Sequence, residues 1–220
     1  MAKDLAIVLN NGSINSAVVT ALAVQKFRLV MLHAEVAQQP AGSRVRAAYD
    51  QQVQHFKPYR EHTLPMPFLS PLQQSARTAA AASDPRMAGG VAAQLTELLP
   101  LLAAAARYAD HYRATAIYLG ARIGGHGDDL AQATEYVQIF NELLQLPCAH
   151  PNLEITAPLL ELEPWQVVDV GFQVNAPFEK TWSCVEESIE PCWACRGCRA
   201  REASFVQTGK PDPTRALRRV

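Results

Sequence analysis

The feature that most constrains this chain is a compact array of cysteines near its C-terminus, with the spacing C-x7-C-x2-C-x2-C: Cys184, Cys192, Cys195 and Cys198. Two-residue gaps let short turns deliver successive sulfurs to one point, and tetrahedral zinc takes four thiolates about 2.3 Å from the metal. A disulfide framework is the alternative, but it is typical of small secreted domains, and we expect no signal peptide here. The array therefore predicts a Zn²⁺ site. We expect it to be structural, because four protein ligands leave no open position for substrate.

Length and charge set further limits. A chain of 220 residues can bury a core without the metal, so one α/β domain with a zinc-binding appendage is the economical interpretation. With 20 Lys+Arg against 21 Asp+Glu, the formal net charge of -1 gives no overall footprint for nucleic acid or anionic membrane. The longest apolar stretch, 98–106, is far shorter than a bilayer span. We therefore expect a cytoplasmic protein with no membrane partner.

The C-terminal segment is locally basic. From Cys192 onward only Glu202 and Asp212 oppose a larger set of cations: Arg196, Arg199, Arg201, Lys210, Arg215, Arg218 and Arg219. A solvated tail is the ordinary interpretation, and a phosphate-binding patch is the alternative. The fifth cysteine, Cys148, lies outside the array and is interpreted as a buried or idle thiol rather than a nucleophile.

Hydrophobic periodicity divides the rest of the chain into alternating strands and helices. Strands are predicted at 5–9, 28–33, 59–64, 116–120 and 153–160, and helices at 16–27, 44–56, 91–112, 129–146 and 164–170. Between 65 and 90 the pattern fails, and a surface loop is predicted, with a lid as the alternative. The order predicts a doubly wound, mostly parallel five-stranded sheet. Such sheets bind ligands outside the carboxyl ends of their strands, near the point where strand order reverses.

The loop after the first strand is the first place to look for a ligand. It reads Asn11-Gly12-Ser13-Ile14-Asn15-Ser16. Glycine and small polar residues can expose backbone N–H groups to an anion, and the helix that follows adds its dipole. A small-residue turn before a helix is also common, so an ordinary turn stays open as the alternative.

Two further strand ends carry polar residues. His33 and Glu35 follow the second strand, and a structural role for His33 is the more ordinary interpretation. After the fourth strand, glycines surround His126, and Asp128 and Asp129 either bind a cation or cap the next helix.

The opening strand–helix–strand unit and the cysteine array resemble the 7-cyano-7-deazaguanine synthase family, a branch of the PP-loop ATP pyrophosphatase group. The match is most specific between 177 and 213. It consists of Thr181-Trp182-Ser183-Cys184, the other three cysteines of the array, Arg201, Phe205, Gly209 and Asp212-Pro213. On this resemblance, residues 1–176 are a PP-loop nucleotide-binding-like α/β domain and residues 177–220 a zinc-binding segment.

The resemblance implies a cytoplasmic ligase of queuosine biosynthesis, often a homodimer, that uses ATP and ammonia to convert 7-carboxy-7-deazaguanine to the nitrile. In the family a Ser-Gly-Gly-x-Asp-Ser loop binds the nucleotide with Mg²⁺. The implied positions for ATP or AMP here are Asn11, Gly12, Ser13, Asn15, Ser16 and Gly120. The implied cofactors are thus structural Zn²⁺ and a nucleotide with Mg²⁺.

The sequence departs from the family at several of these positions. Asn15 replaces an aspartate, which should weaken Mg²⁺ binding, and Ser13 adds a Cβ where the loop is expected to need positive φ or close approach. Residues that contact the deazapurine in the family align near Ala131 and Ala133, and an expected lysine aligns near Pro164. We therefore predict a divergent member with an altered substrate. A catalytically inactive binding or assembly module and a tRNA-binding protein are the alternatives.

Overall fold

The structure, a computed structural model, describes residues 3–36, 43–69, 91–123, 127–145 and 152–216. Its sheet contains β1 (Leu5–Leu9), β2 (Arg28–Glu35), β3 (Arg60–Pro65), β4 (Ala116–Leu119) and β5 (Glu154–Thr156). All four strand pairings are parallel, in the order β3-β2-β1-β4-β5. The predicted five-stranded sheet is confirmed. Strand order reverses between β1 and β4, where a ligand site is expected.

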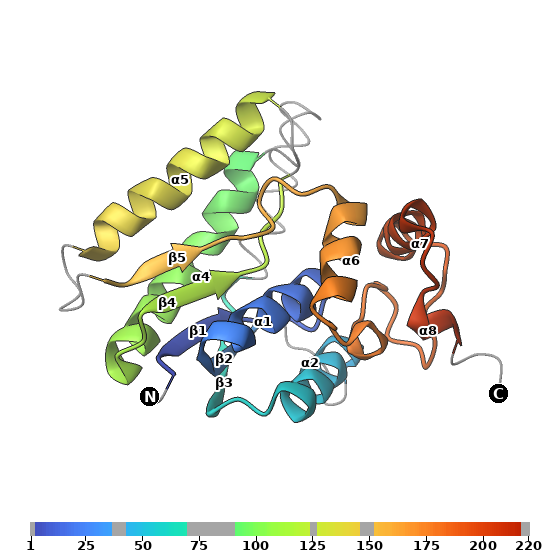
Figure 1. Cartoon of the computed structure of the whole chain (residues 1–220), viewed down its shortest axis with the longest axis horizontal. Helices are drawn as coiled ribbons and strands as arrows, with labels where there is room; N and C mark the ends of the chain where they lie inside the picture. The colour runs from blue at the N-terminus through green and yellow to red at the C-terminus, as the bar shows by residue number, and fades with distance from the viewer. Residues whose placement is uncertain (1–2, 37–42, 70–90, 124–126, 146–151, 217–220) are drawn as a thin grey trace.

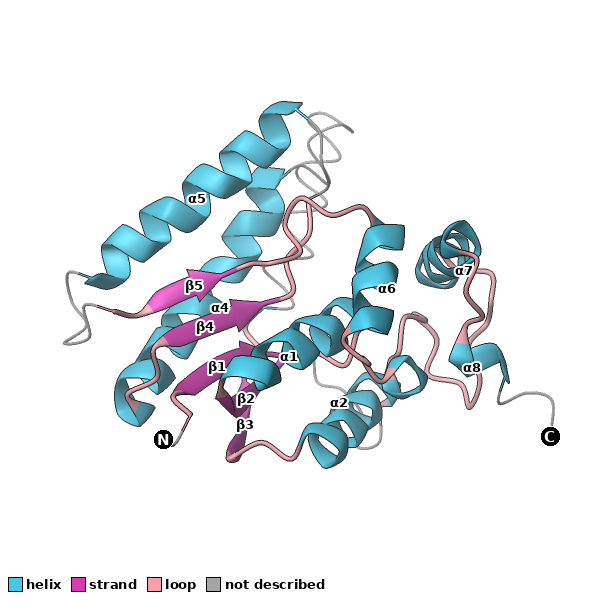
Figure 2. Ribbon diagram, viewed as in Figure 1, coloured by secondary structure: helices cyan, strands magenta, loops and turns pink. Residues whose placement is uncertain are grey.

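Helices cover both faces of the sheet (Figures 1 and 2). On one face lie α1 (Ile14–Lys26), α2 (Arg44–Phe56) and α6 (Pro164–Gln173), and on the other α4 (Val91–Tyr112) and α5 (Gly127–Gln145). Alternate residues of β1 enter the two cores, because successive strand side chains point to opposite faces. Ala6 and Val8 enter the first core and Ile7 enters the second, all fully buried.

Three predicted boundaries differ from the structure. α1 begins at Ile14 rather than at residue 16, because the Ser13 side chain caps it. β5 is shorter than the predicted 153–160, since the chain turns from Ala157 onward. α5 begins at Gly127, so Asp128 and Asp129 fall in its first turn rather than at its cap. Most of the predicted 65–90 loop lies outside the described residues.

The C-terminal segment adds short elements that the pattern did not predict: η2 (Phe178–Lys180), α7 (Arg196–Thr208) and α8 (Pro213–Ala216). Phe178 and Phe205 are buried in the same hydrophobic cluster as β1 and α1, with ring centroids 5.3 Å apart. The segment therefore shares the core of the sheet domain.

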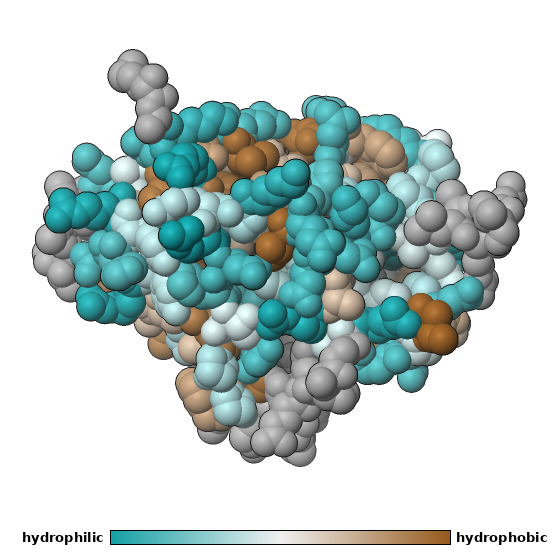
Figure 3. Space-filling view, turned by 90° about the horizontal axis from the view of Figure 1, so that it is seen from below, coloured by the Kyte–Doolittle hydropathy of each residue, from teal (hydrophilic) through white to brown (hydrophobic). Residues whose placement is uncertain are grey.

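The described surface is mainly polar on the side seen in Figure 3, where hydrophobic residues gather chiefly along one edge of the view. Among the described residues, no helix is long and apolar enough to cross a membrane.

Candidate functional site

The four cysteines of the array converge on one point. Their Sγ atoms all lie within 4.8 Å of one another, with Cys184 Sγ 3.4 Å from Cys192 Sγ and 4.0 Å from Cys195 Sγ. Ligands of a tetrahedral ion 2.3 Å away lie about 3.8 Å apart, whereas bonded disulfide sulfurs lie about 2 Å apart. The four thiols are free. The arrangement therefore fits one four-coordinate metal ion rather than the disulfide alternative.

Backbone N–H groups point at these sulfurs. The N–H groups of Glu186 and Cys192 each donate to Cys184 Sγ at 3.3 Å, and that of Cys198 donates to Cys195 Sγ at 3.4 Å. The Cys198 N–H lowers the pKa of Cys195 to about 6, whereas burial raises the pKa of Cys198 to about 12. A buried thiol loses its proton when a neighbouring cation offsets the cost of the charge. The amide donors stabilise thiolate charge, and the buried thiol needs a cation in order to ionise. The site is therefore suited to a divalent metal ion.

Two backbone contacts position the array. A Cβ at Gly197 would lie 2.0 Å from the Ser183 carbonyl oxygen, so a glycine is required where α7 begins beside Cys184. The Trp182 N–H donates to the Gly12 carbonyl oxygen at 3.0 Å. The cysteine segment is therefore attached to the loop after β1.

Arg201 forms the main polar contact beneath the array. It contacts Asp212 through Nε at 2.6 Å and NH2 at 2.8 Å, and both side chains are almost fully buried. It also donates to Thr181 Oγ1 at 2.7 Å and to the Phe178 carbonyl oxygen at 3.1 Å. The sequence grouped Arg201 with the cations of a solvated basic tail, with a phosphate-binding patch as the alternative. The structure assigns its charge to a buried ion pair instead, because α7 packs on the η2 segment.

Gly12 is the turn residue of the loop after β1. It has φ +77°, and a Cβ there would lie 2.7 Å from the Val45 carbonyl oxygen and 3.0 Å from the Tyr49 nitrogen. Conformation and packing against α2 both require glycine. Ser13 has φ -79° and caps α1 by accepting from the Ser16 N–H at 3.3 Å. The expectation that a serine at 13 needs positive φ is therefore wrong.

The loop's own side chains occupy several of its donors. Asn10 Oδ1 accepts from the Gly12 N–H at 2.8 Å, and Asn11 Oδ1 accepts from the Ser13 N–H at 3.2 Å and from Ser16 Oγ at 2.7 Å. Ser16 Oγ in turn accepts from the Asn11 N–H at 3.2 Å. These are the N–H groups that an anion-binding loop presents to its ligand. In this conformation the loop satisfies them internally.

The first turn of α1 has backbone N–H groups that are not paired within the described structure. The N–H groups of Ile14 and Asn15 have no acceptor among the described residues, as is usual for a helix start. The Asn15 side chain donates from Nδ2 to the Gly120 carbonyl oxygen at 3.2 Å, an interaction that an aspartate carboxylate cannot make. A Cβ at Gly120 would lie 3.0 Å from the Asn15 carbonyl carbon, so β4 reaches α1 closely because residue 120 is glycine.

Two cavities flank this loop. The first, of about 290 Å³, lies at the carboxyl ends of β1, β2 and β4, and its polar lining comes from the loop. Its apolar lining consists of Leu9, Leu32, Ala34, Val36, Leu98, Leu101, Leu119 and Ala121. The second, of about 430 Å³, lies between the loop, α6 and the cysteine segment. The structure thus brings the predicted residues 11, 13, 15, 16 and 120 to the point where strand order reverses.

A Mg²⁺ ion fits these cavities poorly. Mg²⁺ is usually held by one or two carboxylates besides substrate phosphates. Among the described residues, no aspartate or glutamate lines either cavity. The loss of a carboxylate at Asn15 is not compensated there.

His33 lies beneath the loop rather than in a cavity. It is buried, its ring stacks on Tyr49 with centroids 4.6 Å apart, and its Nδ1 lies 3.0 Å from the Asn10 carbonyl oxygen. Burial lowers the pKa of His33. Glu35 pairs with Arg46 at 3.0 Å. These contacts support the structural interpretation of His33. His126 and Cys148 lie outside the described residues, and Asp129 is exposed.

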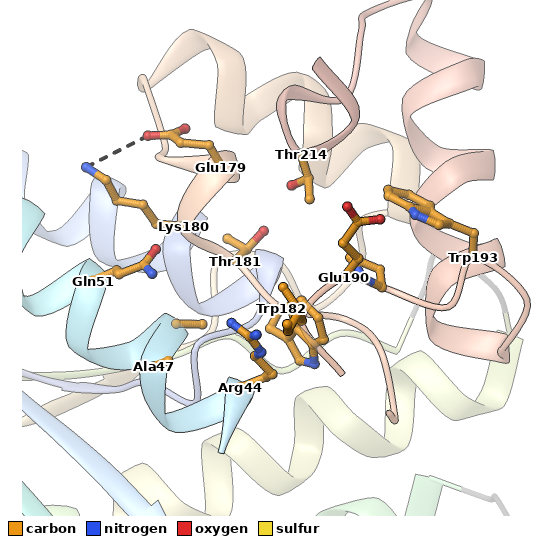
Figure 4. Close-up of a pocket in the computed structure, with 13 residues that line it drawn as sticks. Arg44, Ala47, Gln51, Glu179, Lys180, Thr181, Trp182, Glu190, Trp193 and Thr214 are labelled. Carbon is orange, nitrogen blue, oxygen red and sulfur yellow. Dashed lines mark ion pairs between the residues drawn. The ribbon is translucent and has the colours of Figure 1, made fainter. Parts of the chain in front are cut away.

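A third cavity, of about 220 Å³, separates α2 from the cysteine segment. Figure 4 shows Arg44 beside the Trp182 ring and Lys180 paired with Glu179. The Arg44 Nε donates to the Ser188 carbonyl oxygen at 2.8 Å. Sequence reasoning missed this contact, although the tryptophans next to the cysteines were a signal of packing around the array.

The fold and the sites together define a class: a doubly wound α/β protein with a cavity where strand order reverses and, attached beside it, a cluster of four cysteines that could hold a metal ion. The family described as Queuosine biosynthesis protein QueC matches residues 5–209. The chain therefore belongs to the QueC family, and the predicted resemblance is confirmed.

Individual relatives agree. A 7-cyano-7-deazaguanine synthase from Methanothrix thermoacetophila is 34% identical over 116 residues, which are 52% of each chain. One from Aliarcobacter butzleri is 34% identical over 51% of this chain and 50% of its own. The chain thus matches about half the length of these relatives. One from Chlorobium chlorochromatii is 27% identical, with 94% of each chain covered. A solved NAD⁺ synthetase from Burkholderia pseudomallei is similar at 12% identity and a TM-score of 0.44, covering 98% of this chain and 78% of that one.

Proposed function

We propose that this chain binds ATP or AMP in the cavity at the carboxyl ends of β1, β2 and β4. The observation that carries the proposal is the composition of this cavity, which has an apolar wall suited to a base and a polar wall formed by the loop after β1. Doubly wound sheets bind nucleotides at this point, and a helix N-terminus favours phosphate. The binding residues would be Asn11, Gly12, Ser13, Asn15, Ser16 and Gly120.

ATP would activate a carboxylate as an adenylate with release of pyrophosphate, and ammonia would displace AMP to give the amide, as the synthase resemblance implies. A second ATP would activate the amide oxygen for loss to the nitrile. We propose that the carboxylate is not 7-carboxy-7-deazaguanine. Ala133 is fully buried in an apolar cluster with Ile123 and Leu160, and Ala131 carries no hydrogen-bonding group either. Recognition of a deazapurine needs directed donors and acceptors, which these positions do not supply.

The cysteine centre would hold Zn²⁺ in a structural role. A closed set of four thiolates selects zinc or an iron–sulfur cluster among common metals, and it leaves zinc no open position for substrate. On this proposal residues 177–220 are a zinc-binding segment on a nucleotide-binding domain of residues 1–176. We also propose a cytoplasmic homodimer, as the family resemblance implies, which analytical ultracentrifugation would test.

Calorimetry with ATP and AMP, with and without Mg²⁺, tests the nucleotide proposal. We expect both to bind, with little effect of Mg²⁺ because carboxylates are missing from the described cavity walls. Release of pyrophosphate with a panel of carboxylic acids and ammonia then tests the reaction, and 7-carboxy-7-deazaguanine should be inactive. Failure of both nucleotides to bind at millimolar concentration would refute the proposal.

A second candidate is a binding or assembly module without catalysis. It is favoured by the internal hydrogen bonds of Asn11 Oδ1, which occupy donors that a phosphate would use. A module of this kind would need no Mg²⁺, because it would catalyse no reaction of the nucleotide. Pyrophosphate release with any carboxylic acid plus ammonia would exclude it.

A further inference from the structure

The second cavity beside the loop has the chemistry of an anion site. Its walls come from the N-terminus of α1, from Pro164 and Val168 of α6, from one side of α7 and from the Trp182–Cys184 stretch. It shares Asn11, Ser13 and Asn15 with the first cavity. Two arginines line it, and none of its described lining residues is acidic.

The two arginines differ in their availability. Arg201 is fully engaged by Asp212 and by its other acceptors. Arg122 makes one long hydrogen bond, from NH1 to the Leu162 carbonyl oxygen at 3.5 Å. Within the described part of the chain no carboxylate pairs with it. Arg122 therefore keeps a positive charge that the cavity does not neutralise.

Further donors belong to residues that line the same cavity. The Ile14 and Asn15 N–H groups at the start of α1 lack acceptors among the described residues, and the Trp182 Nε1 is buried without a hydrogen-bond partner there. Buried donors are almost always satisfied in folded proteins, so this indole N–H is available to an acceptor supplied by a ligand or by water. An arginine, an indole N–H and a helix N-terminus favour a multivalent oxyanion.

We propose that Arg122 binds the phosphate chain of the nucleotide in this second cavity, with Trp182 beside it. The inference rests on the proposed function, because a nucleoside in the first cavity reaches the second past the shared residues 11, 13 and 15, through its phosphates. A guanidinium can hold two phosphate oxygens at once, which a lysine cannot reproduce. Arg122 is thus a substrate-binding residue for the polyphosphate group.

Calorimetry on the zinc-loaded chain with inorganic pyrophosphate, ATP and adenosine tests the inference. Arg122→Gln should weaken pyrophosphate and ATP about tenfold or more, the loss expected for a charge-assisted pair, and leave adenosine unchanged. Arg122→Lys should recover only part of the loss. Arg107→Gln, which removes an exposed arginine on α4, is the matched control and should leave all three affinities unchanged. Trp182→Phe should weaken pyrophosphate less than Arg122→Gln does.

The outcomes separate the two proposals. If Arg122→Gln binds pyrophosphate and ATP as tightly as the unmodified chain, the role of Arg122 is refuted while nucleotide binding stands. If the unmodified chain binds adenosine but not pyrophosphate, the anion site is refuted and the nucleoside cavity stands. If it binds pyrophosphate through Arg122 but neither ATP nor adenosine, the anion site stands and the proposed function falls.

Discussion

The cysteine segment and the loop after β1 are neighbours, joined by the hydrogen bond from the Trp182 N–H to the Gly12 carbonyl oxygen. In the cysteine segment, four sulfurs converge and the buried Cys198 thiol needs a cation before it can ionise. In the loop, the side chains of Asn10 and Asn11 already accept from backbone donors. On our proposal a metal ion completes the first region, whereas the second folds without a ligand. Loss of the metal should therefore disrupt structure, and loss of a nucleotide should not.

Replacement of one metal ligand should give the largest effect. Cys195→Ser removes a thiolate whose binding to metal contributes to folding of the segment. We expect metal content to fall from about one ion per chain to almost none, and amide hydrogen exchange to rise between 182 and 205 while the sheet stays protected. Cys148→Ser, outside the array, is the control. Full metal content and unchanged melting in Cys195→Ser would contradict the assignment.

The buried ion pair beneath the array gives the next effect. Arg201→Met leaves Asp212 buried without its partner and should lower the free energy of unfolding by about 3–5 kcal/mol. Arg215→Met breaks a half-exposed pair with Glu202 and should cost about 0–1 kcal/mol. Urea denaturation measures both. Equal losses would show that burial does not distinguish the pairs.

Substitutions at two glycines with positive φ distinguish the cost of backbone strain from the cost of steric overlap. Gly209→Ala places a Cβ with no described atom within 4 Å, so only the left-handed conformation costs stability, about 1–2 kcal/mol. Gly12→Ala adds close contacts with α2 and should cost about 1–3 kcal/mol more. Urea denaturation of both variants gives the difference. Identical losses would mean that α2 moves away at no cost.

Acid should weaken the region beneath the loop. Because burial lowers the pKa of His33 from 6.5, the unfolded chain binds more protons than the folded chain below that pH. This contribution to stability is present above pH 6.5 and is lost as pH falls, at no more than about 1.4 kcal/mol per pH unit. The free energy of unfolding at about pH 7.5 and about pH 5.5 measures it.

His33→Asn should flatten this pH dependence relative to the unmodified chain. Burial lowers the pKa of His55 and His62 as well, so the difference between this variant and the unmodified chain isolates His33. An unchanged slope in His33→Asn would assign the dependence to other groups.

A modest effect on stability should come from the loop itself. Asn11→Ala removes the acceptor of both the Ser13 N–H and Ser16 Oγ and should cost about 1–2 kcal/mol, the net value of two typical hydrogen bonds. On our proposal Asn11 contributes its backbone to the nucleotide site, so pyrophosphate should bind more tightly once Asn11 Oδ1 no longer competes for the Ser13 N–H. Asn152→Ala, at an exposed turn, is the control for removing a carboxamide. Weaker pyrophosphate binding in Asn11→Ala would show that this side chain contacts the anion.

The sheet was predictable because its strands are short apolar runs separated by amphipathic helices. The run 5–9 matches β1, and the helix at 44–56 matches α2. Boundaries failed where a local side chain decided them, as when Ser13 caps α1 two residues early. The short helices after Phe178 were not predicted because they are stabilised by packing against α6 and by the cysteine turns rather than by their own periodicity.

The candidate sites were predictable in so far as they depend on spacing. Two-residue gaps brought the cysteines together, and the glycine turn placed the loop at the sheet edge. Ion pairs between distant residues were not predictable from the sequence. Nothing in the sequence distinguishes Arg201 from the other cations of the segment, whereas the structure pairs it with Asp212. The availability of Arg122 also depends on the lack of acidic residues in the described lining of the second cavity, which the sequence does not reveal.

A crystal structure of the zinc-loaded chain grown with ATP tests the central claim most directly. We predict the base in the apolar cavity at the ends of β1, β2 and β4, and the phosphates past residues 11–15 against Arg122. Saturating ATP that leaves both cavities without nucleotide density, or that binds at another face, would contradict it.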